Sequence, residues 1–551
     1  MTERRRFYLT TAIAYANNRP GLHTLYEVVA ADAIARWHRM LGHDTRFLTG
    51  TDEYSVNIAT TAAERGQSPK AFVDEMVGLF RAAEDALGIS PDRFIRTTDP
   101  DHVPAVHEMI RRAHANGDIY LGSYEGWYCP NEGFRNASDL VEDAAGFHCP
   151  NHPGVDLQWL TERNWFFRLS AYQERLERYY ADHPDWVRPE YRKNEMLGFI
   201  RGGLEDFSIS REGATWGIPF PFQPDGTSAQ RADGSWDPGA GTVYVWYDAL
   251  INYITGAGFP TDTSAFARWW PADLQVIGKD INRLHTIYWP AMLMSAGLPL
   301  PRTVWVHGWL LVQGERMSKS RGNFLDPNAV VGALGQDGAR FVVLREVAFD
   351  RDSDVSWDSF VRRYNADLAN DYGNLLNRSL AMAGRYLDGE RPYPTDGALA
   401  DSWGSTFARY AELLEACLLH EALATLWGFV GEANRFVDAE QPWVLAKAAR
   451  AGDHAAAAHL REVLGDLLEA CRVVSFAAAP FMPATADRAA SQLGVEYAYG
   501  PDGGGGPPLA ELVAWGALRE RGTIGTPAPL FPRLDADEPM DGQEGPDDGP
   551  R

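Results

Sequence analysis

The chain opens with FYLTTAIAY (residues 7–15), a stretch rich in aromatic and β-branched residues that predicts a buried strand. A helical run follows from residue 22 to residue 41, and TRFL (residues 45–48) predicts a second strand. A strand, a helix and a strand at this spacing form a βαβ unit, so we expect an α/β fold with a doubly wound, parallel, Rossmann-like sheet. Ligands of such sheets bind beyond the carboxyl ends of the strands. Tyr15, the turn at residues 17–24 and Asp52 are therefore expected to border one crevice.

The composition is that of a large folded protein. Of 551 residues, 45% are hydrophobic and 23% are charged, which excludes a disordered or fibrous chain. The formal net charge is −24, so any polyanionic partner needs a local positive patch. Four cysteines fit a reducing, cytoplasmic location, and no apolar run reaches the roughly 18 residues of a membrane span. We expect a cytoplasmic enzyme with several domains and no membrane segment.

The texture of the sequence changes several times after the βαβ unit. Short aromatic pieces, glycines and two nearby cysteines predict an inserted, strand-rich domain from about residue 121. Sheet-like stretches return at TVYVW (242–246), LQVI (274–277) and TVWV (303–306), and long amphipathic helices follow residue 350. The predicted segments are two halves of the parallel-sheet domain at 1–120 and 236–349, the insertion at 121–235, a helical domain at 350–500, and a linker with an acidic tail at 501–551.

A short basic loop is the first indication of chemistry. Arg316, Lys319 and Arg321 fall within six residues, between two flanking glycines and after an apolar strand. Such a loop suits closure on a triphosphate and neutralisation of a departing pyrophosphate, although an exposed basic loop without function has the same composition. The common glycine-rich phosphate loops and the hydrolase and kinase signatures are missing from the sequence. A nucleotide would therefore have to be bound by a different structural element.

A second group of residues predicts a slot for a linear hydrophobic amino acid. Trp246, Ala249 and Tyr253 share one face if residues 246–253 are helical. Two further residues form a second wall, and two more come from the edge of the sheet. An aromatic slot with one carboxylate suits an apolar side chain whose ammonium group binds the acid. A buried core stripe is the structural alternative. The residues are Trp246, Ala249 and Tyr253, then Ile281 and His285, then Tyr15 and Asp52.

Several motifs, in order along the chain, resemble one enzyme family. RMSKS (residues 316–320) resembles the KMSKS loop of the class I aminoacyl-tRNA synthetases. The surrounding sequence is similar to the methionyl branch of that family at TGTDE (49–53), YVWYDA (244–249), IGKDI (277–281), WPAML (289–293) and QPW (441–443). The resemblance runs from about residue 7 to residue 532, nearly the whole chain.

The resemblance implies ATP-dependent activation of methionine to methionyl-adenylate, with Mg²⁺ bound to the ATP, and transfer of the acyl group to tRNA. The positions that match the family's methionine site are Ile13, Tyr15, Asp52, Trp246, Ala249, Tyr253, Ile281 and His285. The positions that match its ATP site are Gly21, Thr24, Arg211, Asp280, Arg316, Met317, Ser318, Lys319 and Ser320. The expected catalytic side chains are Lys319, Arg316, Thr24 and His23.

The most serious departure from the family lies at the nucleotide. The family's HIGH motif contributes two histidines to the ATP phosphates, and GLHT (residues 21–24) stands in its place. Gly21 and Thr24 replace both histidines, and His23 falls where the motif has glycine. One residue around a helix is a rotation of about 100°, so we do not expect His23 simply to substitute for a lost histidine. We expect weaker stabilisation of the transition state. Two further changes near the site are Leu250, where the family usually has proline, and the Tyr54-Ser55 pair.

Two other regions carry weaker predictions. CxxE and CxxH spacings in the insertion would hold Zn²⁺ in a zinc knuckle, and the alternative is a degenerate knuckle without metal. By resemblance, Pro442 and Trp443 lie at the anticodon-binding position, where a tryptophan can stack on a base; a plain helix-packing corner is the alternative. The zinc ligands would be Cys129, Glu132, Cys149 and His152.

Three functions remain open at the level of sequence. The first is a methionyl-type tRNA synthetase. The second is a paralogue that passes an activated amino acid to an acceptor other than tRNA in specialised metabolism. The third is a non-catalytic relative that binds amino acid or tRNA without turnover. The altered phosphate motif leaves all three open, because it changes the residues expected to stabilise the reaction but keeps the predicted amino-acid slot.

Overall fold

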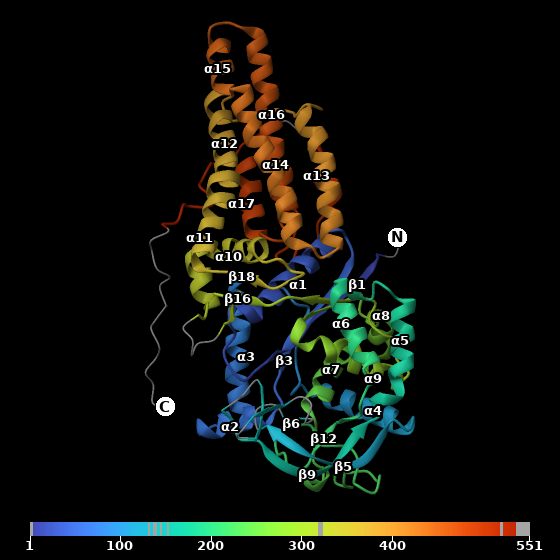
Figure 1. Ribbon diagram of the computed structural model, residues 1–551. Helices are drawn as coiled ribbons and strands as arrows, with labels where there is room; N and C mark the ends of the chain where they lie inside the picture. Colours follow the sequence, from blue (N-terminus) through green and yellow to red (C-terminus); the bar gives the residue numbers. More distant parts are fainter. Residues whose placement is uncertain are drawn as a thin grey trace.

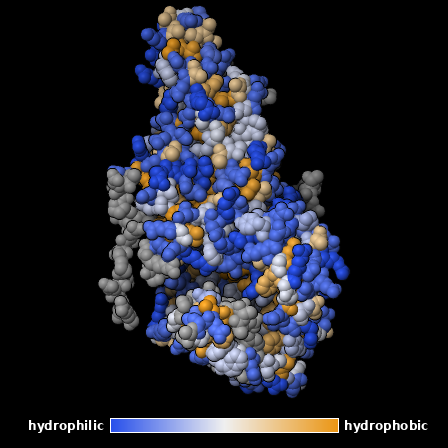
Figure 2. Space-filling model, in the orientation of Figure 1, coloured by the Kyte–Doolittle hydropathy of each residue, from blue (hydrophilic) through white to orange (hydrophobic). Residues whose placement is uncertain are grey.

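The computed structural model describes residues 4–129, 133–135, 140–143, 146–150, 154–317, 323–517 and 522–535. An α/β body occupies the centre of the molecule (Figure 1). A bundle of long helices projects from one end of the body, and a group of antiparallel strands lies at the opposite end. No helix among these residues is long and apolar enough to cross a membrane. On the face drawn in Figure 2, hydrophilic residues dominate and hydrophobic ones are scattered in small groups.

A parallel sheet forms the centre of the body, as the βαβ pattern predicts. Its described strands are β1 (Arg6–Thr11), β2 (Ala14–Tyr15), β3 (Asp44–Asp52), β4 (Arg93–Arg96), β10 (Val187–Arg188), β14 (Leu274–Gly278) and β15 (Val304–His307). They pair in the order β10-β15-β14-β1-β3-β2, with β4 beside β3, and each pairing is parallel. The chain leaves β1 toward β3 and returns on the other side as β14. The carboxyl ends of β1 and β14 therefore form the switch point at which such sheets bind ligands.

Helices pack around this sheet. The first, α1, is buried along nearly its whole length, because its small and apolar side chains lie between the sheet and the helical bundle. It begins after Gly21 and ends before Gly42, whose φ of +82° suits a residue without a side chain. The helices of the body are α1 (Leu22–Met40), α2 (Val56–Glu64), α3 (Pro69–Ala86), α4 (His102–Ala115), α7 (Val245–Thr255), α8 (Thr263–Trp269), α9 (Trp289–Ser295) and α10 (Pro327–Glu346).

One predicted strand is wrong. The stretch at residues 242–246 does not return to the parallel sheet. Only β13 (Thr242–Val243) is extended, and it pairs antiparallel with β12 (Ser210–Arg211). The helix α7 then begins at Val245. The aromatic and β-branched residues resembled a strand, but the apolar residues continue at helical spacing through Ile254, and that longer period decides the structure.

The insertion contains both strands and helices. Four antiparallel strands pair in the order β11-β9-β5-β6 and carry many aromatic residues. Two helices follow β9 within the range predicted as strand-rich. The elements are β5 (Ile119–Cys129), β6 (Gly133–Arg135), β7 (Val141–Asp143), β8 (Gly146–His148), β9 (Gln158–Phe167), α5 (Gln173–Asp182), α6 (Glu190–Arg201) and β11 (Phe207–Ser208).

After α10 the chain becomes almost entirely helical, as predicted. Short strands β16 (Leu310–Val312), β17 (Glu315–Arg316) and β18 (Ser353–Asp354) connect the body to the bundle. The bundle consists of α11 (Trp357–Arg363), α12 (Asn374–Tyr386), α13 (Ala398–Glu415), α14 (Leu419–Glu440), α15 (Pro442–Arg450), α16 (His454–Ala477) and α17 (Pro483–Leu493). The short elements β19 (Glu390–Arg391), α18 (Leu509–Leu512) and β20 (Gly522–Thr523) complete it.

A buried ion cluster joins α1 to the helical bundle. The Asp32 carboxylate lies 2.6 Å from Nε of Arg36 and 2.7 Å from a guanidinium nitrogen of Arg340, and all three side chains are buried. Burial alone would raise the pKa of Asp32, but the two arginines outweigh it and lower that pKa. Arg340 also donates to the carbonyls of Phe481 and Pro480, at 2.8 and 3.1 Å, between α16 and α17. The cluster therefore fastens the first helix of the body to the base of the bundle.

Candidate active site

The candidate site lies where the carboxyl ends of β1, β3 and β14 meet the start of α1. The short strand β2 runs beside β3 and places Tyr15 opposite Asp52 in the register of the pair. Beyond β14 the chain turns through a short helix at Lys279–Ile281 and a π-helix at Leu284–Tyr288, which brings Ile281 and His285 to the same crevice. The fold thus gathers residues that are more than 200 positions apart in the sequence.

One wall of the predicted slot is built on α7. Tyr253 and Ala249 are buried, whereas Trp246, one turn closer to the start of the helix, is 39% exposed. The Tyr253 hydroxyl lies 2.6 Å from Nε2 of His285. Nδ1 of His285 is 2.9 Å from the carbonyl of Ile281. Nδ1 therefore donates to that carbonyl, and Nε2 accepts the hydroxyl proton of Tyr253.

The charge state of this wall follows from its burial. Burial lowers the pKa of His285 to about 4, so the imidazole is neutral at physiological pH. Burial likewise raises the pKa of Tyr253 well above its usual value. The wall is therefore polar in its hydrogen bonding but carries no net charge, and it suits an uncharged side chain.

Asp52 supplies the carboxylate of the slot. The residue is buried, and its Oδ1 has no hydrogen-bond partner among the described residues. Burial, and after it the charge of Asp248, raises the pKa of Asp52 well above its usual value. An unpaired buried carboxylate is costly, and a bound ammonium group would remove that cost.

A second buried acid lies behind the first, and sequence reasoning missed it. Asp248, on α7, lies 2.6 Å from Nε2 of His102 on α4, and both side chains are fully buried. Nδ1 of His102 is 3.0 Å from the Thr255 hydroxyl. The pair joins α4 to α7 and holds the helix that carries Trp246, Ala249 and Tyr253. Only the fold brings residues 102 and 248 together, so no local sequence signal could have found the pair.

The remaining predicted slot residues lie at the edge of the sheet. Ile13, between β1 and β2, is half-buried. The Tyr15 hydroxyl is hydrogen-bonded to the hydroxyl of Ser55, and burial raises the pKa of Tyr15 to about 12. Ser55 also accepts from the amide of Ile58 as the N-cap of α2. Ser55, one of the two residues that differ from the family here, therefore contacts Tyr15 of the predicted slot.

The nucleotide side of the site begins at the N-terminus of α1. Gly21 is the N-cap residue, with φ −107° and ψ 169°, and no side chain caps the helix. Its carbonyl accepts from the amide of Thr24 at 2.9 Å, and the half-buried Thr24 lies in the first turn. His23 is exposed, and its ring packs edge-on against Phe324. The helix end supplies amides and a partial positive charge, which favour an anion.

Cations lie opposite this helix end, around a tryptophan that sequence reasoning missed. The Arg316 guanidinium stacks on Trp309 at 3.3 Å from the ring centroid, and Nζ of Lys279 lies 3.8 Å from the same ring. Lys279 also pairs with Asp352 at 2.5 Å. The GWL sequence at residues 308–310 gave no signal that its tryptophan would position the loop.

The other residues predicted for ATP take the following places. Asp280 is exposed in the short helix after β14. The Arg211 guanidinium stacks on Tyr244 at 3.8 Å from the ring centroid and donates to the Ser208 hydroxyl at 2.9 Å. Met317 is buried. Ser318, Lys319 and Ser320 lie outside the described residues.

A buried acid–imidazole pair underlies the cleft. Glu27 of α1 accepts from the amide of Ala12 at 2.7 Å, and its other oxygen lies 2.7 Å from Nε2 of His307. Nδ1 of His307 donates to the carbonyl of Gly308, so the pair shares one proton between the carboxylate and Nε2. Burial alone would lower the pKa of His307, but the bond to Glu27 outweighs it and raises that pKa. The pair fixes α1 against the carboxyl ends of β1 and β15.

The predicted metal ligands are only partly described. Cys129 ends β5 and Cys149 follows β8, and both side chains are buried. Glu132 and His152 lie outside the described residues. Among the described residues no group of three or more His, Cys, Asp or Glu side chains could hold a metal ion.

The predicted anticodon residues lie far from the crevice, at the tip of the bundle (Figure 1). Gln441 ends α14 in a left-handed conformation, with φ +45°, and Pro442 is buried as the first residue of α15. Trp443 is 42% exposed. Figure 2 shows hydrophobic residues at this tip. The corner predicted to bind the anticodon therefore buries its proline and leaves its tryptophan accessible.

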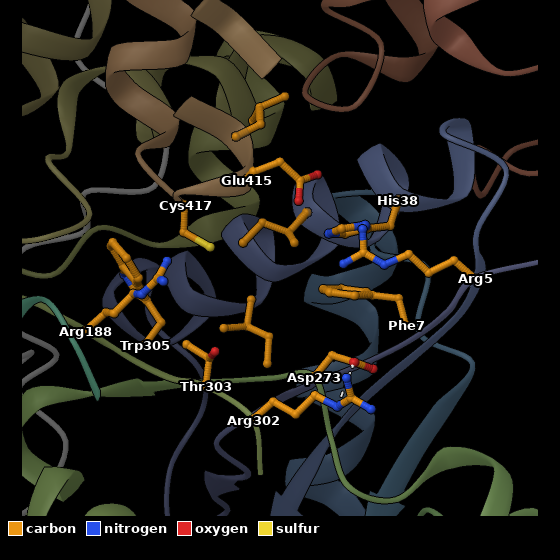
Figure 3. Close-up of a pocket in the computed structure, with 13 residues that line it drawn as sticks. Arg5, Phe7, His38, Arg188, Asp273, Arg302, Thr303, Trp305, Glu415 and Cys417 are labelled. Carbon is orange, nitrogen blue, oxygen red and sulfur yellow. Dashed lines mark ion pairs between the residues drawn. The ribbon is translucent and has the colours of Figure 1, made fainter. Parts of the chain in front are cut away.

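A separate cavity of about 220 Å³ opens at the opposite, amino-terminal ends of β1, β14 and β15 (Figure 3). Its lining includes Asp273 and Arg302, which pair at 3.4 Å, and Cys417 from the turn between α13 and α14. Burial raises the pKa of the Cys417 thiol to about 12, so the thiol is not a nucleophile at neutral pH. The cavity is smaller than the ~300–1,000 Å³ of typical ligand pockets and takes no part in the crevice.

Comparison with known proteins gives matches along almost the whole chain. The family model described as tRNA synthetases class I (M) matches residues 7–380. Methionine–tRNA ligase of Thermosynechococcus vestitus is 43% identical over 545 residues, which cover 96% of this chain and 97% of the relative. The same enzyme of Mycobacterium bovis is 42% identical over 546 residues, 98% of this chain and 99% of the relative.

A solved structure agrees in fold as well as in sequence. Mycobacterium tuberculosis methionyl-tRNA synthetase in complex with methionyl-adenylate superposes with a TM-score of 0.87 at 41% identity. The match covers 96% of this chain and 100% of that chain. The α/β class with a helical C-terminal region, predicted from the sequence, is thereby confirmed.

Proposed function

This chain belongs to the methionyl branch of the class I tRNA synthetases, and from that premise we propose that it activates methionine with ATP and transfers it to tRNA. In the first step a carboxylate oxygen of methionine attacks the α-phosphorus of ATP. The bond from that phosphorus to pyrophosphate breaks, and methionyl-adenylate forms. In the second step the terminal ribose hydroxyl of tRNA attacks the acyl carbon and AMP leaves.

The observation that carries the proposal is a lone buried carboxylate beside an uncharged slot. Asp52 has an oxygen without a partner among the described residues, and burial with the charge of Asp248 raises its pKa. The α-ammonium of an amino acid has the charge and the donors to pair with this carboxylate. The hydrogen bond between Tyr253 and His285 leaves the wall of the slot neutral. An uncharged thioether side chain fits such a wall better than a lysine or glutamate does.

The nucleotide is held between the start of α1 and the basic loop. The helix end offers amides to the phosphates, and Arg316 with Lys319 would stabilise the charge that builds on the departing pyrophosphate. Mg²⁺ bound to ATP would neutralise phosphate charge in the same region. Because GLHT replaces the family's HIGH motif, we expect slower adenylate formation than in relatives with both histidines, since one well-placed donor often contributes about 10²–10³ in rate.

The second substrate needs contacts at both ends of the molecule. Trp443 at the tip of the bundle is accessible for stacking on an anticodon base. The strands of the insertion lie at the other end, beyond the crevice, and would guide the acceptor end (Figure 1). Two buried thiols at Cys129 and Cys149 fit zinc in their chemistry, and with Glu132 and His152 they would form a structural Zn²⁺ site in this insertion.

Pyrophosphate exchange with a panel of amino acids tests the proposal. Methionine should support exchange, and Asp52→Asn should raise the KM for methionine by roughly 10- to 150-fold, because a hydrogen bond to a charged group contributes about 1.5–3 kcal/mol. The KM for ATP should stay the same. Charging of methionine tRNA then tests the second step. Exchange without charging would indicate a different acceptor, and no exchange with any amino acid would refute catalysis.

A further inference from the structure

At the start of α1, the space beside Gly21 is filled by the side chain of His23. A Cβ built on Gly21 would lie 2.6 Å from Cε1 and 2.7 Å from Nδ1 of His23. It would also lie 2.6 Å from Cε2 of Phe324. No real side chain approaches so closely. The imidazole of His23 therefore occupies the volume in which a side chain at position 21 would begin.

The backbone does not explain the glycine. Gly21 has φ −107° and ψ 169°, an extended conformation open to every residue type. Ser, Thr, Asp or Asn would cap the helix better at this position. The reason for glycine is thus the space that it gives to the ring of His23. The two changes from the family motif, a histidine lost at 21 and one gained at 23, are one coupled change.

The ring of His23 lies beside residues of the predicted ATP site. Helix rotation places the backbone of residue 23 away from that of residue 21, but the side chain folds back across Gly21. Desolvation of the ring, and after it the charge of Arg316, lowers the pKa of His23, while Asp280 acts in the opposite sense. Both neighbours are residues of the predicted ATP site. The ring therefore lies near the helix end and close enough to Arg316 and Asp280 to interact with their charges.

The imidazole of His23 can donate a hydrogen bond to a ligand. Cε1 and Nδ1 are the ring atoms nearest to Gly21, and Nε2 is the second nitrogen, bonded to Cε1. Within the part of the chain that the structure describes, the imidazole makes no hydrogen bond, and His23 is an exposed residue. A neutral imidazole carries one N–H, which can donate to a phosphate oxygen without any proton transfer.

We propose that His23 is the phosphate-binding imidazole of this chain and that Gly21 is the residue that admits it to that position. The inference rests on the proposed function and adds to it: the motif is shifted in sequence, but its imidazole is retained in space. As the pyrophosphate leaves, the N–H of His23 donates to one of its oxygens and stabilises the charge that develops there. His23 is then a catalytic residue, and Gly21 is a positioning residue.

Three variants separate this assignment from a passive ring. His23→Ala removes the imidazole, Gly21→Ala displaces it with one added methyl group, and the double exchange Gly21→His with His23→Gly moves it to position 21. The readouts are the kcat and the KM values for ATP and methionine in pyrophosphate exchange, together with the unfolding temperature. His454→Ala, which removes an exposed histidine from the first turn of α16, is the matched control.

We expect both single variants to lower kcat by about 10²-fold, with little change in the KM for methionine or in unfolding temperature. The exchanged pair should recover only part of the lost rate, because it returns one imidazole to this region while the Cβ added by Gly21→His would also lie 2.6 Å from Cε2 of Phe324. The control should behave as the parent. A normal kcat in His23→Ala would overturn the assignment.

A binding measurement keeps this test independent of the overall reaction. Calorimetry with ATP and Mg²⁺ should show weaker binding to His23→Ala than to the parent. If the parent exchanges no amino acid, the proposed function fails, and the ATP affinities still decide the role of His23. Equal affinities in the parent and the variant would refute the inference on their own.

Discussion

Replacing Tyr253 by phenylalanine tests the neutral wall of the slot with the smallest possible change. The substitution keeps the ring and removes one hydroxyl, which in the parent lies 2.6 Å from Nε2 of the buried His285. Nδ1 of His285 remains engaged with the carbonyl of Ile281, so its tautomer is fixed and Nε2 keeps its lone pair. The variant therefore leaves a buried acceptor without its partner.

The size of the effect follows from this orphaned acceptor. Leaving a buried polar group unsatisfied costs about 1–3 kcal/mol. If that cost falls on the methionine-bound state, affinity falls by roughly 5- to 150-fold, at about 1.4 kcal/mol per tenfold. We expect the KM for methionine in pyrophosphate exchange to rise by that factor while the KM for ATP stays constant. A double-mutant cycle with His285→Phe should show that the second substitution adds less than it does in the parent.

Two outcomes would contradict this reasoning. An unchanged KM for methionine would mean that the pair lies outside the slot. Equal increases in both KM values would mean that Tyr253→Phe disturbs the fold of α7 rather than one substrate. Ala249→Gly is a poor control because it loosens the helix, so Thr263→Ser at the start of α8, outside the crevice, serves instead.

Three further predictions follow from features described above. Burial, and after it the charge of Asp248, raises the pKa of Asp52, so the ammonium group of methionine should bind less well as the pH falls through that raised pKa. Asp248→Asn removes one negative charge and should shift the acidic fall in kcat/KM for methionine to lower pH. A fall that stays at the same pH would argue against coupling between the two acids. Arg340→Leu should lower the free energy of unfolding by about 3–5 kcal/mol in urea titrations, since it leaves Asp32 short of one of its cations, and Arg340→Lys should cost less. Trp443→Ala should raise the KM for tRNA by roughly 5- to 150-fold, at about 1–3 kcal/mol per stacked base, with pyrophosphate exchange as the unaffected internal control.

Much of the fold could be predicted from local sequence pattern. The βαβ unit at the N-terminus was clear because β1, α1 and β3 each carry the periodicity of their structure, and the helices after residue 350 were clear for the same reason. The stretch at residues 242–246 was misread because a short apolar run does not distinguish a strand from the start of a buried helix. The helix on which Trp246, Ala249 and Tyr253 lie was nevertheless anticipated by their spacing.

The site was harder to predict where it depends on side chains meeting across the fold. The pair of His102 with Asp248 and the pair of Glu27 with His307 each join residues more than 140 positions apart. Neither pair has a local motif. The path of the His23 side chain was also beyond the sequence, because helical geometry fixes where a Cβ leaves the backbone but not how the ring then turns.

The ion cluster of Asp32, Arg36 and Arg340 gives α1 a mechanical role. The proposed phosphate site lies at the start of this helix, and eleven residues after Gly21, roughly 16 Å at 1.5 Å per residue, Asp32 fastens the helix to the base of the bundle. Arg340 holds the connection between α16 and α17, and α16 extends toward the tip that carries Trp443. Because one buried cluster contacts both elements, it fixes the position of α1 relative to the base of the bundle. The geometry of the proposed nucleotide site therefore depends on an anchor to the helical bundle as well as on the parallel sheet.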